Sequence, residues 1–263
     1  MNEPFSWEPN QYEKFIELRT RPALDLLRRI VLDNPHCIYD LGCGTGKITR
    51  LLADRWPGAR VIGIDRSIDM LRKAREATSN VEWLEADIST WGANEAVDLI
   101  FSNAVLHWVP HHEELFPRFA KQLHKSGVLA VQMPVNWASP SHQIMREIFL
   151  QMEQAGGMAR AALRAKLERP PVANASDYYE ILAPVTESVD IWITEYEHAL
   201  KGTDPVVEWM KGTGLRPVLA SLSEAERESF LSDYAARIAR AYPARRDGTT
   251  LFPFRRLFIV AIR

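Results

Sequence analysis

Short apolar runs, separated by amphipathic stretches, recur along the first half of the chain. The apolar runs cover residues 37–41, 60–65, 81–87, 97–103 and 128–133. The stretches between them place apolar residues at helical spacing, over 48–55, 68–78 and 113–123. Buried parallel strands read as nearly continuous apolar runs, and amphipathic helices join them by right-handed crossovers. The pattern therefore predicts an α/β fold with a parallel sheet.

The second half of the chain has a different rhythm. Residues 135–188 and 203–250 read as mostly helical, 189–196 alternates like a strand, and 255–262 is an apolar run that fits a buried strand. Together with the regular alternation over 36–134, these segments predict one domain with a ligand-binding core, helical substrate-side segments and two closing strands. The first 35 residues read as helical. Their apolar side chains either pack on the sheet or fold over the ligand as a lid.

A glycine-rich turn follows the first predicted strand. Asp40 precedes Gly42, Gly44 and Gly46 in the spacing D-x-G-x-G-x-G, and an amphipathic run begins at Ile48. Glycine tolerates positive φ and lets backbone N–H groups approach a ligand, and in open parallel sheets ligands bind at such strand ends. The turn is therefore the predicted ligand-binding loop. The alternative is a glycine-rich turn without a ligand.

Acidic residues end the next two predicted strands. Asp65 lies 19 residues after Gly46, close to the spacing at which a second-strand carboxylate accepts hydrogen bonds from ribose hydroxyls. Asp65 also fits the start of the following helix, where Ser67 is a candidate N-cap, and the two roles are compatible. Met70, in the same helix, is a candidate contact for a nucleobase. Asp87 ends the third run, so acids from three strands would meet at one edge of the sheet.

The glycine spacing differs from the G-x-G-x-x-G fingerprint of dinucleotide-binding proteins, because the third glycine is at position 46. It resembles motif I of the class I S-adenosylmethionine-dependent methyltransferases. The resemblance implies a Rossmann-like, seven-stranded, mostly parallel sheet with helices on both faces, an antiparallel last strand and a helical insertion. It implies S-adenosyl-L-methionine as cofactor, with Asp87 and Ile88 at the adenine and Asn103 near the methyl-transfer position. An acid such as Asp40 suits the ammonium and sulfonium of this cofactor.

Several stretches of the second half resemble members of this family that methylate small polycarboxylic acids. They are 131–134, 136–137, 145–147, 178–182, 189–192, 213–217 and 256–261. The resemblance implies that one carboxylate of such an acid becomes a monomethyl ester. Arginine grips carboxylates in a bidentate manner, and the candidate substrate contacts are Trp137, Arg146, Tyr179, Arg216 and Arg256. Arg255 and Arg256 alternate along a strand, so at most one of them should face the site.

The need for a general base depends on the methyl acceptor. A carboxylate is already ionised at pH 7, so its oxygen can attack directly, and catalysis would consist of alignment and exclusion of water. An amine or a phenol would instead need a base, for which His107 is the candidate. A non-catalytic protein that keeps the fold is a further alternative, disfavoured by the intact glycine loop and the three acids. No cluster of metal-binding residue types stands out in the sequence.

Composition and charge narrow the range of partners. The chain has 263 residues and a formal net charge of −2, with Lys and Arg interspersed among Asp and Glu, which argues against nucleic-acid binding. No run approaches ~18 apolar residues, and the N-terminal stretch lacks the apolar core of a signal peptide. Cys37 and Cys43 form neither a disulfide framework nor a metal site by themselves. We therefore expect a cytoplasmic, monomeric enzyme that acts on a small molecule.

Overall fold

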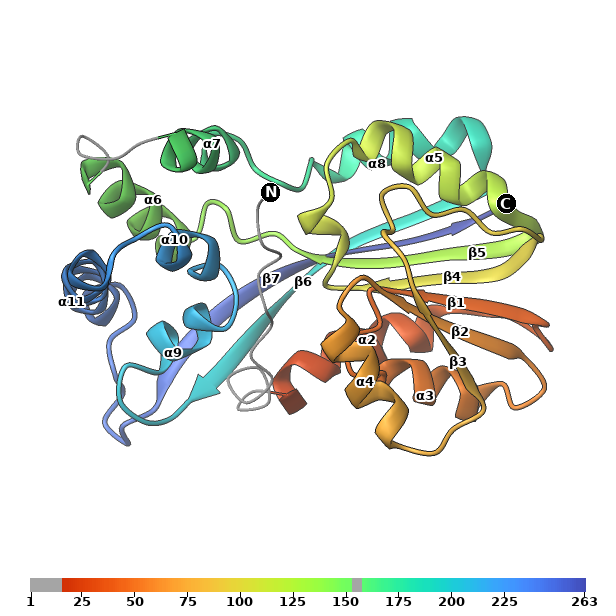
Figure 1. Ribbon diagram of the computed structural model, residues 1–263, viewed down its shortest axis with the longest axis horizontal. Coiled ribbons are helices and arrows are strands. Elements are labelled where there is room, and N and C mark those ends of the chain that lie inside the picture. Colours follow the sequence, from red (N-terminus) through yellow and green to blue (C-terminus); the bar gives the residue numbers. More distant parts are fainter. Residues whose placement is uncertain (1–15, 153–157) are drawn as a thin grey trace.

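The computed structural model describes residues 16–152 and 158–263 and is built on a seven-stranded sheet (Figure 1). The strands are β1 (Cys37–Leu41), β2 (Arg60–Asp65), β3 (Val81–Glu85), β4 (Val97–Asn103), β5 (Leu123–Pro134), β6 (Ser188–Leu200) and β7 (Thr250–Ile262). Their order in the sheet is β3-β2-β1-β4-β5-β7-β6. β7 runs antiparallel to both of its neighbours, whereas β1 to β5 pair in parallel. The predicted fold class, including the antiparallel last strand, is confirmed.

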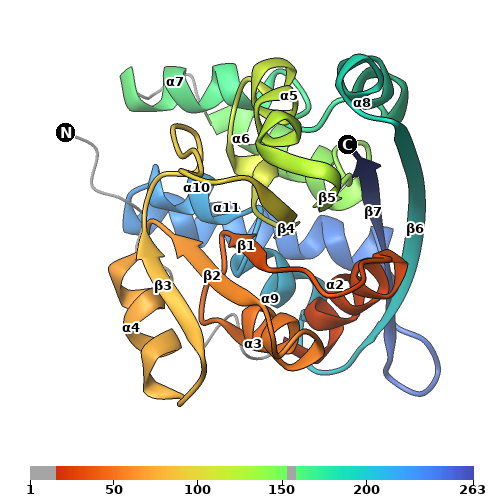
Figure 2. The same ribbon diagram turned by 90° about the vertical axis from the view of Figure 1, so that its right-hand side faces the viewer.

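Helices cover both faces of this sheet and form a further group at one end of it (Figure 1). They are α2 (Ile16–Arg29), α3 (Lys47–Arg55), α4 (Ile68–Glu76), α5 (His112–Gln122), α6 (Pro140–Met152), α7 (Met158–Leu167), α8 (Ala175–Leu182), α9 (Pro205–Lys211), α10 (Arg216–Ala220) and α11 (Glu224–Ala241), with short 3₁₀ turns η1 (Leu106–Trp108) and η3 (Ala183–Val185). Figures 1 and 2 show α2, α3 and α4 on one face and α5 and α8 on the other. In the described part of the chain, no helix is both long and apolar enough to cross a membrane.

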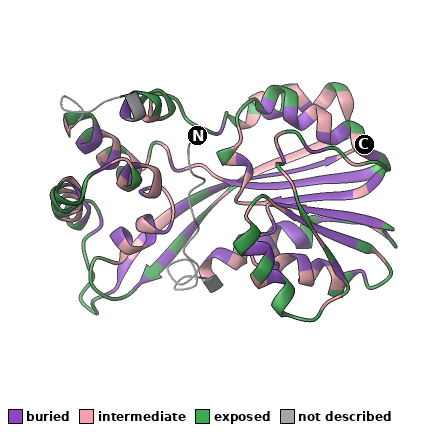
Figure 3. Ribbon diagram, viewed as in Figure 1, coloured by how far each residue is buried: buried purple, intermediate pink, exposed green. Residues whose placement is uncertain are grey.

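The central strands form because they are apolar on both faces. Every residue of β1 is buried, and Leu99, Ile100 and Phe101 of β4 are 0% exposed. Figure 3 shows this burial along the middle of the sheet. Removing apolar surface from water contributes about 25 cal/mol per Å², so strands covered on both faces hold the two helical layers together. Asp40 is the one carboxylate within β1, and it is buried with the rest of the strand.

β6 and β7 extend past the end of β5 as a two-stranded ribbon, and a second group of helices packs beside this ribbon. Their pairing runs from Ser188 opposite Ile262 to Leu200 opposite Thr250. The predicted helical segments contain α6 to α8 and α9 to α11, and α6, α9, α10 and α11 gather at this end of the molecule, on the left in Figure 1. Trp209 of α9 lies in their shared core, with aromatic side chains of β7. The group therefore stands beside the carboxyl ends of the parallel strands, where ligands bind in such sheets.

Four strands differ in their bounds from the sequence expectations. β5 begins at Leu123, before the predicted 128, because Leu123 already pairs with Val97 ahead of a register shift in the ladder. β6 extends to Leu200 and β7 begins at Thr250, beyond the predicted 189–196 and 255–262, because each strand supplies the other with hydrogen-bonding partners outside the main sheet. β3 ends at Glu85, and Asp87 lies two residues beyond it.

The N-terminal helix contains a proline in its interior. α2 continues through Pro22, although proline is favoured at the first position of a helix. Arg19 and Ala23, on either side of the proline, are both buried, so packing outweighs the single backbone hydrogen bond that proline removes. The predicted lid spans residues 1–35, and its first 15 residues lie outside the part of the chain that is described.

Candidate active site

The glycine loop joins β1 to α3 and lies against the end of β2. The N–H groups of Gly42 and Cys43 both donate to the carbonyl of Ile64, at 2.7 and 2.9 Å. Gly42 has φ +73°, and a Cβ built there would lie 2.5 Å from Val105, so a larger residue would collide. Gly44 has φ +56°, and no atom of the described residues lies within 4 Å of its Cβ position. The loop is thus closed beside Val105 and open beside Gly44.

Asp65 connects this loop to the start of α4. One carboxylate oxygen accepts from the N–H of Gly44 at 2.9 Å, and the other accepts from the N–H of Ser67 at 2.8 Å. Ser67 is the N-cap of α4, as predicted, and its Oγ accepts from the N–H of Met70 at 3.4 Å. Met70 is buried, and Gly46 immediately precedes α3. A carboxylate has about four acceptor positions, so Asp65 has capacity for two further donors.

Asp40 is buried in β1 at the base of the loop. It is 3% exposed, and its Oδ2 accepts from the hydroxyl of Thr49 at 2.6 Å. Burial raises the pKa of the Asp40 carboxyl to about 7, and the negative charge of Asp65 adds to the rise, against the hydrogen bond from Thr49. A nearby cation would lower this pKa and favour the ionised form. Asp40 is therefore an acid whose charge depends on what occupies the loop.

Asp87 stands at the same edge of the sheet, beside Asp65. The N–H of Ala86 donates to the carbonyl of Asp65 at 3.2 Å, which ties this segment to the end of β2. Oδ1 of Asp87 accepts from the N–H of Ser89 at 2.8 Å, and hydrogen bonding to Ser89 lowers the pKa of Asp87. The Asp87 side chain is exposed, whereas that of Ile88 is buried in the core under α5. Asp87 is therefore an ionised acceptor open to a ligand.

Three buried polar atoms lack partners where β4 and β5 end. They are Oδ1 of Asn103, Nδ1 of His107 and Nε2 of Gln132, none of which has a hydrogen-bond partner in the described residues. Asn103 and Gln132 are register partners on neighbouring strands, and the N–H of Ala104 donates to the carbonyl of Gln132 at 2.9 Å. Buried polar atoms are usually paired, so this group indicates a place where a ligand completes the hydrogen bonding.

Arg256 brings a positive charge to this group. It is 4% exposed, lies opposite Pro134 in the register of β5 and β7, and donates from Nη1 to Oε1 of Gln132 at 3.2 Å. Arg255, its neighbour on β7, is exposed and lies 4.0 Å from Glu195. As the alternation of a strand predicts, one of the two arginines faces inward.

His107 lies in η1, two residues after Val105, which covers the glycine loop. Burial lowers the pKa of the His107 imidazole to about 3, and the positive charge of Arg256 adds to this effect. The imidazole is therefore neutral at pH 7 and a weak proton acceptor. This property argues against the general-base role that the sequence leaves open for His107, because an effective base has a pKa near the working pH.

Arg146 is a half-buried cation that is held in place by Trp137. Its Nη1 donates to the carbonyl of Trp137 at 2.8 Å, and the guanidinium carbon lies 3.9 Å from the centroid of the indole ring. Burial lowers the pKa of Arg146. Among the described residues it has no carboxylate within ion-pair distance, and neighbouring Glu147 pairs with Arg237 at 3.7 Å instead. A fixed guanidinium with this environment is suited to bind an anion.

His142 links Arg146 to the other residues of the site. It lies one turn before Arg146 on α6, and burial, with the charge of Arg146, lowers the pKa of His142 to about 4. His142 in turn is close enough to His107 to affect the pKa of that imidazole. A Cβ on Gly214 would lie 3.3 Å from Nε2 of His142, and half-buried Arg216 begins α10 two residues later. Side chains from α6, η1 and β7 therefore lie near enough to affect one another's charge, and we call His142, Arg146, His107 and Arg256 the basic site.

Tyr179 is not brought to this site, contrary to the sequence expectation. Its side chain is 55% exposed on α8, which Figure 1 places beside α5 and away from α6 and α10. Its neighbour Tyr178 is buried and donates from its hydroxyl to Nδ1 of His112 at 2.6 Å. Nε2 of His112 donates to the carbonyl of Leu106 at 2.9 Å. The tyrosine that supports the site is therefore Tyr178, which holds η1 in place through His112 and the carbonyl of Leu106.

Sequence reasoning missed His142 and Gln132, and it did not assign to Tyr178 the role of supporting η1. The spacing of four residues between His142 and Arg146 could have indicated a shared helical face. Gln132 and Tyr178 offered no comparable pattern, because their neighbours are set by strand order and by helix packing.

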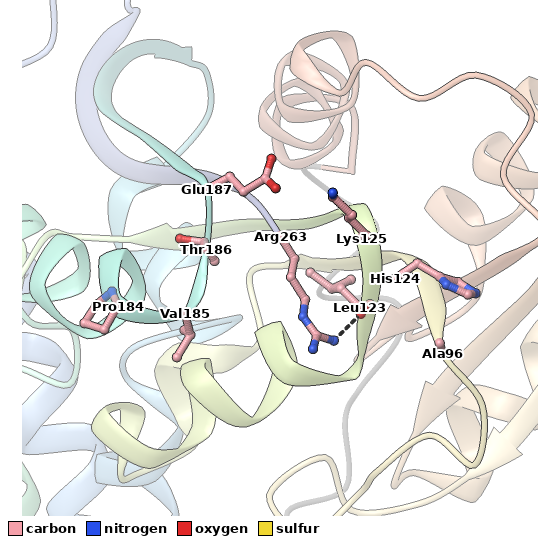
Figure 4. A pocket seen from close by; sticks show the side chains of 9 residues that line it. All are labelled: Ala96, Leu123, His124, Lys125, Pro184, Val185, Thr186, Glu187 and Arg263. Carbon is pink, nitrogen blue, oxygen red and sulfur yellow. Dashed lines mark hydrogen bonds between the residues drawn. The ribbon is translucent and has the colours of Figure 1, made fainter.

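A separate hollow lies at the amino ends of the parallel strands, opposite the basic site (Figure 4). It is lined by Ala96, Leu123, His124, Lys125, Pro184, Val185, Thr186, Glu187 and Arg263. The guanidinium of Arg263 donates to the carbonyls of Leu123 and Lys121. These bonds satisfy carbonyls at the end of α5, so the arginine has a structural role there. None of the predicted site residues lines the hollow.

Comparisons with known proteins agree with this arrangement. A family model described as a methyltransferase domain matches residues 38–127. The YcgJ protein of Bacillus subtilis superposes with a TM-score of 0.58 at 12% identity, covering 92% of this chain and 97% of that chain. Phosphoethanolamine N-methyltransferase 2 of Haemonchus contortus, solved with S-adenosyl-L-methionine, gives 0.53 at 17% identity, covering 92% of this chain and 52% of that chain. These structural likenesses show the fold, and residues 38–127 are similar to a methyltransferase domain.

Two curated relatives define the family within this class. The trans-aconitate 2-methyltransferase of Azoarcus sp. (strain BH72) is 46% identical over 258 residues, covering 98% of this chain and 99% of the relative. The enzyme of the same name from Afipia carboxidovorans is 48% identical over 258 residues, with the same coverage. The chain belongs to the trans-aconitate 2-methyltransferase family.

Proposed function

We propose that this methyltransferase transfers the methyl group of S-adenosyl-L-methionine to one carboxylate of trans-aconitate and forms a monomethyl ester. The observation that carries the proposal is the basic site around Arg146 and Arg256, which adjoins the glycine loop through η1. The chain is also 46–48% identical, over nearly its whole length, to relatives named for this reaction. A small tricarboxylate has the charge that such a site would neutralise.

The residues around the glycine loop fit S-adenosyl-L-methionine. The open side of the loop at Gly44 would admit the cofactor, and Asp65 would accept from its ribose hydroxyls. Exposed Asp87 would accept from the adenine amine. Asp40 would supply negative charge at the base of the loop, and the unpaired Oδ1 of Asn103 would accept from a donor of the cofactor. When bound, this cofactor supplies a methyl group carried by a sulfonium ion.

The contribution of the protein to the reaction would be alignment and charge. The carboxylates of trans-aconitate are ionised at pH 7, so the attacking oxygen carries no proton that a base must remove, and neutral His107 is not required to accept one. Arg256, beside Gln132 and η1, would hold the reacting carboxylate at the edge nearest the glycine loop. Burial around Arg256 excludes water, which strengthens its attraction for the carboxylate.

The carboxylates that do not react would be held from the helical group. Arg146, stacked on Trp137, would bind one of them, and Arg216 at the start of α10 is the third candidate cation. The ester carries one negative charge fewer than the substrate, so the same arginines would bind the product more weakly. This difference would favour product release.

A labelled-methyl assay tests the proposal. The purified protein is incubated with methyl-labelled S-adenosyl-L-methionine and a panel of di- and tricarboxylic acids, amines and phenols, and the products are identified by mass spectrometry. We expect a monomethyl ester of trans-aconitate as the main product. Preferential methylation of an amine or a phenol, or no transfer to any carboxylic acid, would contradict the proposal.

We further infer that the chain acts as a cytoplasmic monomer on a small molecule. The site residues named above come from a single chain, the net charge of −2 gives no electrostatic basis for binding nucleic acid, and both cysteines are buried free thiols. Light scattering on the purified protein should give a mass near 30.0 kDa. A concentration-independent dimer would contradict the inference.

A further inference from the structure

The first turn of α6 is fixed from beneath by two buried tyrosines. The hydroxyl of Tyr234, on α11, donates to the carbonyl of Ser141 at 3.0 Å. The N–H of Ser141 donates to the hydroxyl of Tyr242, which caps the end of α11, at 3.2 Å. Ser141 is itself 0% exposed. The residue that follows, His142, is therefore presented from a rigid part of the helical group.

The imidazole of His142 is oriented by two serines. Its Nδ1 lies 3.2 Å from the hydroxyl oxygens of both Ser139 and Ser141. The proton of Ser139 is directed to the carbonyl of Asn136, at 2.6 Å. The hydroxyl of Ser141 can therefore donate either to Oγ of Ser139, at 3.0 Å, or to Nδ1 of the ring. When it donates to the ring, Nδ1 is the acceptor and Nε2 carries the proton. An anion near Nε2 would select this tautomer.

Nε2 of His142 lies on the side of the ring away from the two serines and has no hydrogen-bond partner among the described residues. It points toward Gly214, where a Cβ would lie 3.3 Å away, so the absence of a side chain at 214 leaves space beside the ring. Arg146, one turn further along α6, is the half-buried guanidinium held by Trp137. The two side chains share one face of the helix and offer a neutral donor next to a cation.

We propose that His142 is a substrate-binding residue, which donates from Nε2 to one of the outer carboxylates of the tricarboxylate and makes the enzyme prefer tricarboxylates to dicarboxylates. The inference rests on the proposed function and deepens it. Arg256 and His107 lie at the edge where the methyl group would be transferred, whereas His142 and Arg146 lie on α6. The helix would therefore take a carboxylate that does not react.

Two amide substitutions separate the roles of the two ring nitrogens. In His142→Gln the amide reaches about as far as Nε2 and keeps a donor there, whereas in His142→Asn the shorter amide reaches only the position of Nδ1. We expect His142→Asn to raise KM for trans-aconitate by roughly 10- to 150-fold, the range for losing a hydrogen bond to a charged group, with kcat changed less than about threefold. We expect His142→Gln to stay within about fivefold of the parent. Thermal unfolding and cofactor affinity of both variants, measured by calorimetry, show that they are folded.

Two dicarboxylates identify the carboxylate that His142 binds. Mesaconate and itaconate each lack a different one of the two outer carboxylates of trans-aconitate. One of these two acids lacks the carboxylate that His142 binds. On that acid, His142→Asn should change kcat/KM less than about threefold. An equal loss on all three acids, or no loss on trans-aconitate, would overturn the inference.

Gly214→Ala gives a further test, because its methyl group would lie 3.3 Å from Nε2 of His142, while the flexible end of Met210, 2.9 Å away, would have to move aside. It should raise KM for trans-aconitate without changing cofactor affinity. Gly58→Ala is the matched control, since a Cβ at that exposed glycine meets no described atom within 4 Å. Gly214→Ala kinetics equal to those of the control would also count against the role of His142.

The parent enzyme distinguishes the failure of this inference from that of the proposed function. If it methylates a different polycarboxylate, the same variants are compared on that acid and on its analogues lacking one carboxylate, and the same outcomes decide. If the parent methylates no carboxylic acid, both the proposed function and the role of His142 are wrong.

Discussion

Replacing Asp40 by asparagine should stabilise the unliganded protein at high pH and weaken cofactor binding. The Asp40 carboxyl has a pKa of about 7 in the folded protein, against an ordinary value of 3.8. Between these values the folded state holds a proton that the unfolded state has lost, so this group makes stability fall as pH rises from about 4 to 7. Asparagine has the same shape and no charge, and its carbonyl can still accept from Thr49.

The magnitude follows from the difference between the two pKa values. At about 1.36 kcal/mol per pH unit, the raised pKa of Asp40 reduces the free energy of unfolding by about 2 kcal/mol at pH 5 and by about 4 kcal/mol at pH 8, as upper limits because a folded site relaxes. An unsatisfied amide N–H group of asparagine costs about 1–3 kcal/mol at both pH values. The advantage of Asp40→Asn over the parent should therefore grow by up to roughly 2–3 kcal/mol between pH 5 and pH 8.

Urea unfolding of both proteins without cofactor, at pH 5, 6.5 and 8, measures this difference directly. The buried histidines, whose pKa values are lowered, act in the opposite direction, since their neutrality adds stability as pH rises toward 6.5. They are present in both proteins, so they cancel in the comparison. Calorimetry in buffers of different ionisation enthalpy should also show that cofactor binding to the parent releases a proton near pH 7. Asp40→Asn should bind more weakly and release none.

A pH-independent difference between the parent and Asp40→Asn would refute the reasoning, because it would mean that Asp40 does not titrate with a raised pKa. Thr49→Val supplies a second check. It removes the hydrogen bond that favours the ionised carboxyl, so it should destabilise the protein more at pH 8 than at pH 5. The opposite pH dependence would show that Thr49 does not act through Asp40.

Four further outcomes test the site. Arg146→Ala should raise KM for trans-aconitate roughly 10- to 150-fold, which corresponds to a loss of about 1.5–3 kcal/mol of binding free energy, with cofactor affinity unchanged. Arg146→Lys should restore KM only partly, because lysine lacks the bidentate fork of arginine. Kinetics equal to those of the parent would exclude Arg146 from the substrate site. Asp65→Ala should weaken S-adenosyl-L-methionine binding by about 1.5–3 kcal/mol in calorimetry, and undiminished affinity of the folded variant would remove Asp65 from the ribose site. With both substrates saturating, kcat should not change between about pH 6.5 and 8.5. A decrease of kcat by ~10²–10⁴-fold in His107→Ala would instead indicate general-base catalysis. Tyr179→Phe should leave KM for trans-aconitate unchanged, and an increase would return this tyrosine to the substrate site.

The parallel half of the fold could be predicted because its central strands, β1 and β4, are buried on both faces. β1, with five buried residues, has no polar face that could be mistaken for a helix or a surface strand. The ribbon of β6 and β7 was harder to delimit. Beyond Ile193, β6 alternates exposed Glu195 and Glu197 with buried Tyr196 and His198. Such a pattern indicates a strand but does not show where its partner on β7 begins.

The cofactor side of the site was visible in the sequence because its residues are local. Gly42, Gly44 and Asp65 lie on two consecutive strand–loop units, and a fixed spacing relates them. The substrate side depends on contacts between residues far apart in the chain. Arg256 reaches Gln132 only because β7, the last strand in the chain, lies between β5 and β6 in the sheet. On α8, a step of one residue turns a side chain by about 100°, which is why Tyr178 rather than Tyr179 faces the interior.

The mixture of arginines and histidines in the basic site has a physical reason. Arg146 and Arg256 keep their charges when buried. Burial lowers the pKa of His142 and His107, and the charges of Arg146 and Arg256, respectively, lower them further. The unliganded site therefore holds fixed positive charges beside two neutral rings, which limits repulsion between cations in a poorly solvated region. A neutral imidazole can still donate one hydrogen bond, so a carboxylate that enters the site can contact the arginines and the rings without the uptake of a proton.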